Sequence, residues 1–107
     1  MTIANLLAPL PAAGRDEVFE TLLHRPGVHL ERIVSHGQTT PAGAPMVQDH
    51  DEWVLLLAGQ AALRIGDAPE VTLTPGDHLT IAAGVPHSVT RTSIDPPAVW
   101  LALHLAG

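Results

Sequence analysis

The chain has no cysteine, tyrosine or lysine, and its net charge is −6 with only five basic residues, all arginine. The absence of cysteine excludes disulfides, thiol nucleophiles, thiolate zinc sites and iron–sulfur clusters. The absence of lysine excludes Schiff-base chemistry and a phosphate-binding P-loop. Because the arginines of this acidic chain do not cluster, we expect neither nucleic acid nor an anionic membrane as a partner.

Long hydrophobic runs are also missing, since no apolar stretch approaches the roughly 18 residues of a membrane-spanning helix. The segment 1–9 lacks the basic start of a secretory signal, and we therefore expect a cytoplasmic protein. Hydrophobic residues nevertheless make up 46% of the 107 residues, and charged residues 15%. This composition excludes disorder and predicts one compact domain.

Ten prolines and nine glycines divide the sequence into short apolar or β-branched runs. This rhythm is typical of an all-β sandwich or barrel. We expect residues 1–14 to form an N-terminal arm, with a single helical turn at most, and residues 15–107 to form one domain. The Arg25-Pro26-Gly27 turn predicts a hairpin between 16–24 and 28–34. Further strands are expected at 53–57, 61–65, 71–73, 78–81, 86–91 and 98–104.

The spacing of residues becomes specific around Glu52 and His87. Glu52 is followed after six residues by Gly59, and Gly76 is followed by Gly84 and, three positions later, by His87. These spacings resemble the end of the first cupin motif and most of the second. Segments 31–35, 51–57 and 100–104 are similar to those of small single-domain bacterial cupins. The resemblance implies an all-β, antiparallel fold, the cupin double-stranded β-helix or jelly-roll barrel.

Cupin membership also implies a metal site, usually made of two histidines and a glutamate from the first motif and a histidine from the second. In this sequence Met46 and Gln48 occupy the two histidine positions of the first motif, so Glu52 and His87 alone keep the usual ligand types. We expect Met46 to line the pocket rather than to bind metal. Arg91, which replaces the asparagine of the second motif, is expected to line the pocket as well.

Gln48, His50 and Glu52 share the parity that places side chains on one face of a strand. A straight strand would separate Gln48 and Glu52 too widely to share an ion, so we expect the chain to turn between them and make them near cross-strand neighbours. Gln48, Glu52 and His87 would then form the inner ligand set, completed by His50 or His104. Two histidines and a carboxylate suit iron, manganese, nickel or zinc.

Purely structural roles compete with these assignments. Glu52 could bond to backbone amides at a hairpin, and His87 could donate to a carbonyl in the core. His104 would face outward if the leucines that alternate with it face the core. The remaining four histidines flank turns or loops and are expected in solvent; they are His24, His29, His36 and His78.

Two functions follow from this site, and whether the protein is an enzyme stays open. The first is a cupin that holds a divalent metal, with the metal acting on a small organic substrate. The second is a metal-free binding module for a small polar or sugar-like molecule. The high apolar content of so small a domain also predicts a homodimer that buries an exposed sheet face.

Overall fold

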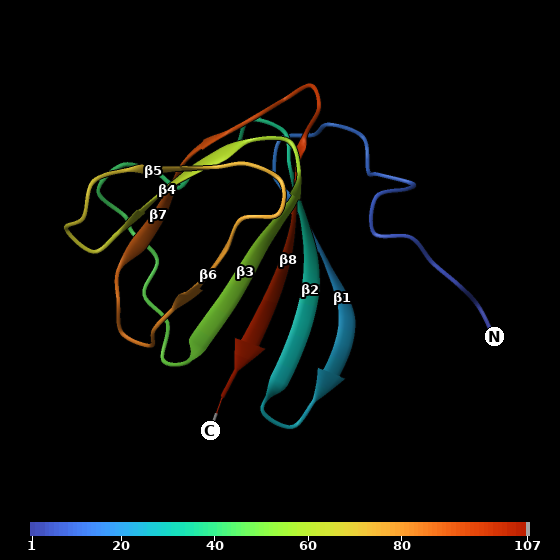
Figure 1. The fold of residues 1–107 in the computed structure, drawn as a ribbon, viewed down its shortest axis with the longest axis horizontal. Helices are drawn as coiled ribbons and strands as arrows, with labels where there is room; N and C mark the ends of the chain where they lie inside the picture. The colour runs from blue at the N-terminus through green and yellow to red at the C-terminus, as the bar shows by residue number, and fades with distance from the viewer. Residues whose placement is uncertain (107) are drawn as a thin grey trace.

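The computed structural model describes residues 1–106 and consists of eight strands in two antiparallel sheets (Figure 1). The larger sheet has the order β1-β2-β8-β3-β6, and the smaller has the order β5-β4-β7. Within residues 1–106 there is no helix that could cross a membrane. The strand bounds are β1 Val18–Arg25, β2 Val28–Ser35, β3 Asp51–Ala58, β4 Ala61–Ile65, β5 Val71–Leu73, β6 His78–Ile81, β7 His87–Thr92 and β8 Ala98–Leu105.

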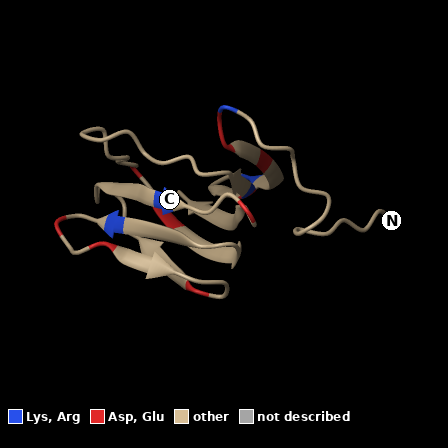
Figure 2. Ribbon diagram, turned by 90° about the horizontal axis from the view of Figure 1, so that it is seen from above, with Lys and Arg blue, Asp and Glu red and all other residues tan. Residues whose placement is uncertain are grey.

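The two sheets face each other in a jelly-roll sandwich, and Figure 2 shows the layers from above with the N-terminal arm extending away from them. The all-β fold expected from the sequence is confirmed. The two sets of strand ladders do not join into one closed barrel, because β5-β4-β7 forms a separate sheet. Contacts outside the named ladders, such as the isolated bridge between Met46 and His87, tie the layers together.

Period-two alternation places the core and the site on the same inner face. Along β3, Glu52, Val54 and Leu56 are buried while the residues between them are more exposed. On β8, Trp100 and Ala102 are buried with His104 on the same side. The leucines of β8 that alternate with His104 therefore do not face the core, and His104 points inward. The core cluster comprises Val54, Leu56, Ala61, Leu63, Leu73, Ile81, Ala98, Trp100 and Ala102.

Gly59 shows why one position of the first motif requires glycine. It connects β3 to β4 with φ +78°, a conformation that L side chains rarely adopt. A Cβ at this position would lie 2.4 Å from the carbonyl oxygen of Pro97 and 2.8 Å from the Cα of Ala98. The turn therefore packs against the start of β8 at a distance that only glycine allows.

The N-terminal segment contains no helical turn; Leu6 and Pro9 lie against β2 at Arg32, while the first residues extend away from the sheets (Figure 2). Arg32 on β2 holds it there: its Nη1 donates to the carbonyl oxygens of Leu6 at 3.0 Å and Pro9 at 3.1 Å. The same guanidinium donates through Nε and Nη2 to Glu20. A buried arginine thus fixes a segment that lies outside both sheets.

Candidate functional site

A cavity of about 110 Å³ opens between the inner faces of the two sheets. Its walls are mainly apolar, and its polar groups, apart from Glu17, gather at one end. The lining residues are Glu17, Phe19, Glu31, Ile33, Met46, Gln48, Glu52, Val54, Leu63, Ile81, His87, Val89, Trp100 and His104. Gln48, Glu52, His87 and His104, expected from the sequence to form the site, therefore meet in one space.

The segment that carries Gln48 is held by backbone hydrogen bonds to the second motif. The amide of Met46 donates to the carbonyl of His87 at 2.8 Å, and the amide of His87 donates back at 2.9 Å. The amide of Gly84 donates to the carbonyl of Gln48 at 2.7 Å. The chain then bends at residues 49–50 and enters β3. The pairing between the two motif segments thus places Gln48 beside His87.

The expected cross-strand pairing of Gln48 with Glu52 is wrong, although both side chains line the cavity. Glu52 is aligned with Ile81 of β6 on one side and with His104 of β8 on the other. Both edges of β3 are therefore occupied at this position, and no edge is left for Gln48. The bend changes the direction of the chain without forming a hairpin.

His87 presents a free imidazole nitrogen to the cavity. Its side chain is 3% exposed, and Nδ1 lies 3.1 Å from the carbonyl oxygen of Val85. Because a carbonyl only accepts, Nδ1 carries the proton and neutral His87 keeps a lone pair on Nε2. Buried polar atoms without a hydrogen-bond partner are uncommon in folded proteins, yet both Nε2 of His87 and Oε1 of Gln48 are of this kind.

Glu52 faces the same space. Its Oε1 lies 3.8 Å from Nε2 of His87, and its Oε2 lies 3.8 Å from Nε2 of His104. Burial raises the pKa of Glu52 above its ordinary value, and the neighbouring His104 and His87 oppose that rise. The negative charge of Glu31 adds to the rise. A carboxyl group, an imidazole lone pair and an amide oxygen thus converge on the polar end of the cavity.

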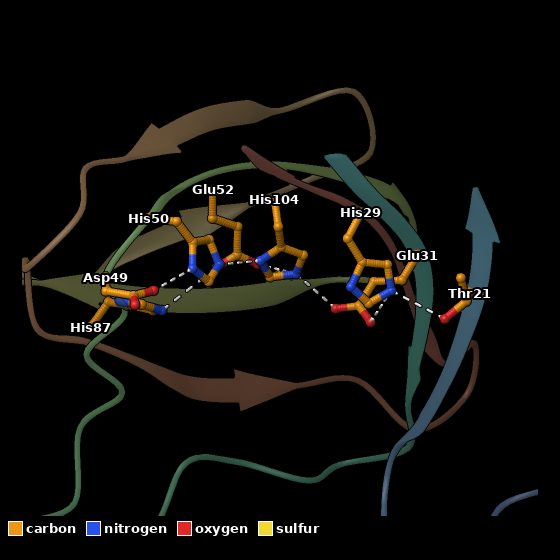
Figure 3. Close-up of polar contacts among 8 residues, drawn as sticks. All are labelled: Thr21, His29, Glu31, Asp49, His50, Glu52, His87 and His104. Carbon is orange, nitrogen blue, oxygen red and sulfur yellow. Dashed lines mark hydrogen bonds and ion pairs between the residues drawn. The ribbon is translucent and has the colours of Figure 1, made fainter. Parts of the chain in front are cut away.

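A chain of hydrogen bonds runs from this end of the cavity to the surface (Figure 3). Asp49 Oδ1 lies 3.0 Å from His50 Nδ1, His50 Nε2 lies 2.9 Å from His104 Nδ1, and His104 Nε2 lies 2.9 Å from Glu31 Oε1. All four ring nitrogens of His50 and His104 are engaged in these contacts. The bond from His50 lowers the pKa of the exposed Asp49.

The donor set decides how well a metal fits this cavity. Both nitrogens of His50 and both nitrogens of His104 are engaged in the hydrogen-bonded chain, so neither ring offers a free lone pair. Within residues 1–106, no three histidine, aspartate or glutamate side chains are grouped so that they could hold a metal ion. Glu52, His87 and the amide oxygen of Gln48 remain as the candidate donors.

The spacing of these donors is close to what a metal requires. Two ligands bound tetrahedrally at about 2.1 Å lie about 3.4 Å apart. The Glu52 and His87 atoms, at 3.8 Å, need to approach by only a few tenths of an ångström to share an ion. Glu52 and His87 thus lie close to the spacing that a shared cation requires, with Gln48 lining the same cavity, whereas His50 and His104 are engaged in the hydrogen-bonded chain.

The two residues expected to line the pocket have different positions. Met46 lines the cavity, and its side chain is partly exposed. Arg91 is exposed on β7 and does not line the cavity. The reason is a bulge in β7: Ala62 is aligned with Arg91 and the next residue of β4 with Val89. The extra residue reverses the alternation, so that Val89 faces the cavity and Arg91 faces solvent.

Sequence reasoning missed Glu31, the buried carboxylate that bonds to His104. Glu31 lies on the inner face of β2 between His29 and Ile33, and His29 Nε2 is 3.9 Å from Glu31 Oε2 and 3.1 Å from Thr21 Oγ1. His29, expected in solvent, therefore adjoins the site. The signal in the sequence was that Glu31 lies two residues before the apolar Ile33, so that both side chains face the same side of a strand. Recognising it required knowing that β2 pairs with β8, which places His29 opposite His104.

Comparisons with known proteins agree with this architecture. A protein of Ralstonia eutropha JMP134, described as a "putative mannose-6-phosphate isomerase", is 38% identical, with 100% of both chains covered and a TM-score of 0.94. A protein of Thermus thermophilus is 22% identical over 98% of this chain and 97% of its own, with a TM-score of 0.80. A cupin superfamily protein of Desulfitobacterium hafniense DCB-2 is 18% identical over 92% and 84%, with a TM-score of 0.76.

A search of curated proteins finds no match. The family model of the cupin domain matches residues 32–104, which include both motif segments and all of the candidate donors. The chain therefore belongs to the cupin family.

Proposed function

We propose that this cupin binds a divalent first-row metal ion at the polar end of its cavity and uses it in chemistry on a small organic molecule. Glu52, His87 and Gln48 would hold the ion. The observation that carries the proposal is the pair of buried, unpartnered donor atoms, His87 Nε2 and Gln48 Oε1, beside the Glu52 carboxylate. Burying such atoms without a partner costs stability, which a ligand would offset.

The donor types indicate the class of metal. One imidazole and two oxygen donors suit iron, manganese, nickel or zinc, and the absence of thiolate removes any preference for soft metals. A metal bound there would supply Lewis-acid polarisation of a substrate oxygen. Three protein donors leave coordination positions that face the rest of the cavity, where a substrate would enter.

Neighbouring residues orient His87 and His104. The carbonyl oxygen of Val85 accepts a hydrogen bond from Nδ1 of His87 and so keeps the lone pair of Nε2 directed into the cavity. His104 lies 3.8 Å from Glu52 and is oriented by Glu31 and His50. This arrangement places a hydrogen-bonded chain next to the Glu52 carboxylate, through which a proton would pass between the substrate and the surface at Asp49.

Metal content tests the proposal directly. We expect untagged protein purified without chelator, or reconstituted with each metal, to contain iron, manganese, nickel or zinc at about one ion per chain. Glu52→Gln and His87→Ala should both lose the ion. His78→Ala is the matched control, because His78 is exposed on the outer face and contacts Trp53 instead of the cavity. Wild-type protein that stays empty with every metal would refute the proposal.

A second candidate function is metal-free recognition of a small polar molecule by the same donors. It is favoured by the engagement of both His104 nitrogens in hydrogen bonds, which leaves one imidazole where cupins use several. In that case the ligand would donate to His87 Nε2 and Gln48 Oε1 directly. Elemental analysis separates the two functions, since this candidate requires an empty protein that still depends on His87 for ligand binding.

A further inference from the structure

Apart from the histidines, every ionisable side chain that lines the cavity is a glutamate. Glu17, Glu31 and Glu52 line it, whereas no arginine is among the lining residues in the described part of the chain. The arginines that are close in sequence to the lining residues point elsewhere. Arg15 and Arg64 are exposed and do not line the cavity. Arg32 lies on the outer face of β2 and binds Glu20 and the N-terminal segment, and Arg91 is turned to solvent by the β7 bulge. A phosphate or carboxylate inside this cavity would meet no fixed positive charge.

A bound metal ion would not reverse this balance. A divalent cation on Glu52 would be opposed by the charges of Glu52 and the neighbouring Glu31, with Glu17 adding a further negative charge at the opening. Metal loading therefore leaves the cavity without the surplus positive charge that recognition of a phosphate monoester needs.

The size and walls of the cavity restrict the ligand further. Its volume is about 110 Å³, whereas an engineered apolar cavity of about 150 Å³ accepts one benzene molecule. The walls opposite the polar end are made of Ile33, Leu63, Val89 and Trp100. A ligand enclosed in this space therefore has an apolar body of fewer than six non-hydrogen atoms.

The opening of the cavity is apolar as well. Phe19, which is 56% exposed, and Met46, which is 39% exposed, both line the cavity and lie at its rim. A longer ligand would thus leave the cavity across hydrophobic side chains and not across a basic rim. Apart from Glu17, the polar lining groups lie at the buried end, where Nε2 of His87 has no hydrogen-bond partner.

We propose that the cavity selects small, uncharged organic molecules with an apolar body and one hydroxyl or carbonyl group at the end that meets Glu52 and His87, and that it rejects sugar phosphates. This inference rests on the proposed function for the polar end, since it assigns the substrate class of the same site. It also separates this chain from the activity named for its Ralstonia relative, because the cavity has neither the room nor the positive charge for a hexose phosphate.

A matched pair of probes tests the inference. Cyclobutylmethanol and cyclobutanecarboxylate share a carbon skeleton of suitable size but differ in charge. We expect the alcohol to bind metal-loaded wild-type protein with a Kd of about 1 mM, an affinity within reach of ligands of this size. The carboxylate and mannose 6-phosphate should bind at least about tenfold more weakly, measured by saturation-transfer NMR titration.

Two variants assign the selectivity to size and charge. Val89→Phe narrows the cavity and should abolish binding of the alcohol. Glu17→Gln keeps an acceptor for the Ser35 hydroxyl while removing a charge, and it should tighten carboxylate binding without changing alcohol binding. Circular dichroism and urea unfolding confirm that each variant is folded. His78→Ala, at an exposed position outside the cavity, is the control that should bind the alcohol like wild type.

The outcomes separate this inference from the proposed function. Equal or tighter binding of the carboxylate or of mannose 6-phosphate, or no binding of the alcohol, overturns the inference even if a metal binds. A preference for the alcohol in protein that takes up no metal supports the inference and refutes only the metal proposal. Unchanged alcohol binding by a folded Val89→Phe variant would also overturn it, because the probe would then bind elsewhere.

Discussion

Gln48→Met should make the chelator-treated protein more stable while weakening metal binding. Oε1 of Gln48 is buried without a hydrogen-bond partner, and such an atom costs about 1–3 kcal/mol. Methionine is also unbranched, with a polarisable thioether that adapts to irregular space, so the substitution removes the orphaned acceptor with little change in packing. We expect the free energy of unfolding to rise by about 1–2 kcal/mol, since part of the gain is lost with the amide nitrogen.

The assay is urea unfolding in chelator, followed by the fluorescence of Trp53 and Trp100, with thermal unfolding as a second measure. A gain of 1 kcal/mol corresponds to a rise in Tm of about 4 °C or slightly more for a domain of this length. Gln60→Met is the matched control, because Gln60 is exposed in the turn after β3 and a substitution there should change stability by less than about 0.5 kcal/mol.

Addition of metal should reverse the order of stability. Wild-type protein gains about 2.7 kcal/mol when free metal reaches a hundred times its Kd, and Gln48→Met gains less because one donor is lost. A Gln48→Met variant that is less stable than wild type in chelator would refute the reasoning. In that case Oε1 of Gln48 would have a hydrogen-bond partner in the dissolved protein, and the strongest argument for a ligand at this position would fail.

Three further substitutions test the site and its frame. Burial raises the pKa of Glu52 above its ordinary value of 4.5, so the folded state binds the proton of this carboxyl group more tightly than the unfolded chain does. The stability that this proton contributes is complete below pH 4.5 and is lost as the pH rises through the pKa of the folded state. Wild type should therefore lose stability relative to Glu52→Gln as pH rises in urea titrations with chelator, and parallel curves would count against a buried carboxyl group. Leu56→Ala, at a fully buried core position, should cost about 2–5 kcal/mol in the same titrations. Arg32→Met should cost about 1–3 kcal/mol and expose the N-terminal segment to limited proteolysis, whereas an unchanged digestion pattern would show that other contacts hold it.

Much of the fold was predictable because turn chemistry and alternation are local properties. The Arg25-Pro26-Gly27 turn joins β1 to β2, and the expected strands correspond to β3 through β8 with shifts of one or two residues at their ends. Gly59 illustrates why the motif spacing was informative: its backbone conformation and its close approach to β8 permit only glycine. The positive φ of a turn is set within a few residues, so the sequence displays this constraint directly.

Arg91 and Glu31 show what could not be predicted. The position of Arg91 depends on a single-residue bulge, which reverses the side-chain alternation of β7 and leaves no clear mark in the sequence. The role of Glu31 depends on pairing between strands that are 73 residues apart at the Glu31–His104 contact. His29 was expected in solvent for the same reason, since only the β2–β8 register brings it beside that pair.

The sequence by itself determined the all-β class, the cupin motifs and the types of donor side chain. The absence of cysteine and lysine excludes thiolate and Schiff-base chemistry, and the spacing of glycine and proline sets the turns between strands. The tertiary structure decided which of those donors are free. His50 and His104 have the right chemistry for a metal, but the register of β2, β8 and β3 engages all four of their ring nitrogens with each other and with carboxylates. His87 and Gln48 keep unpartnered atoms, because the backbone pairing that positions them also leaves those atoms facing the cavity.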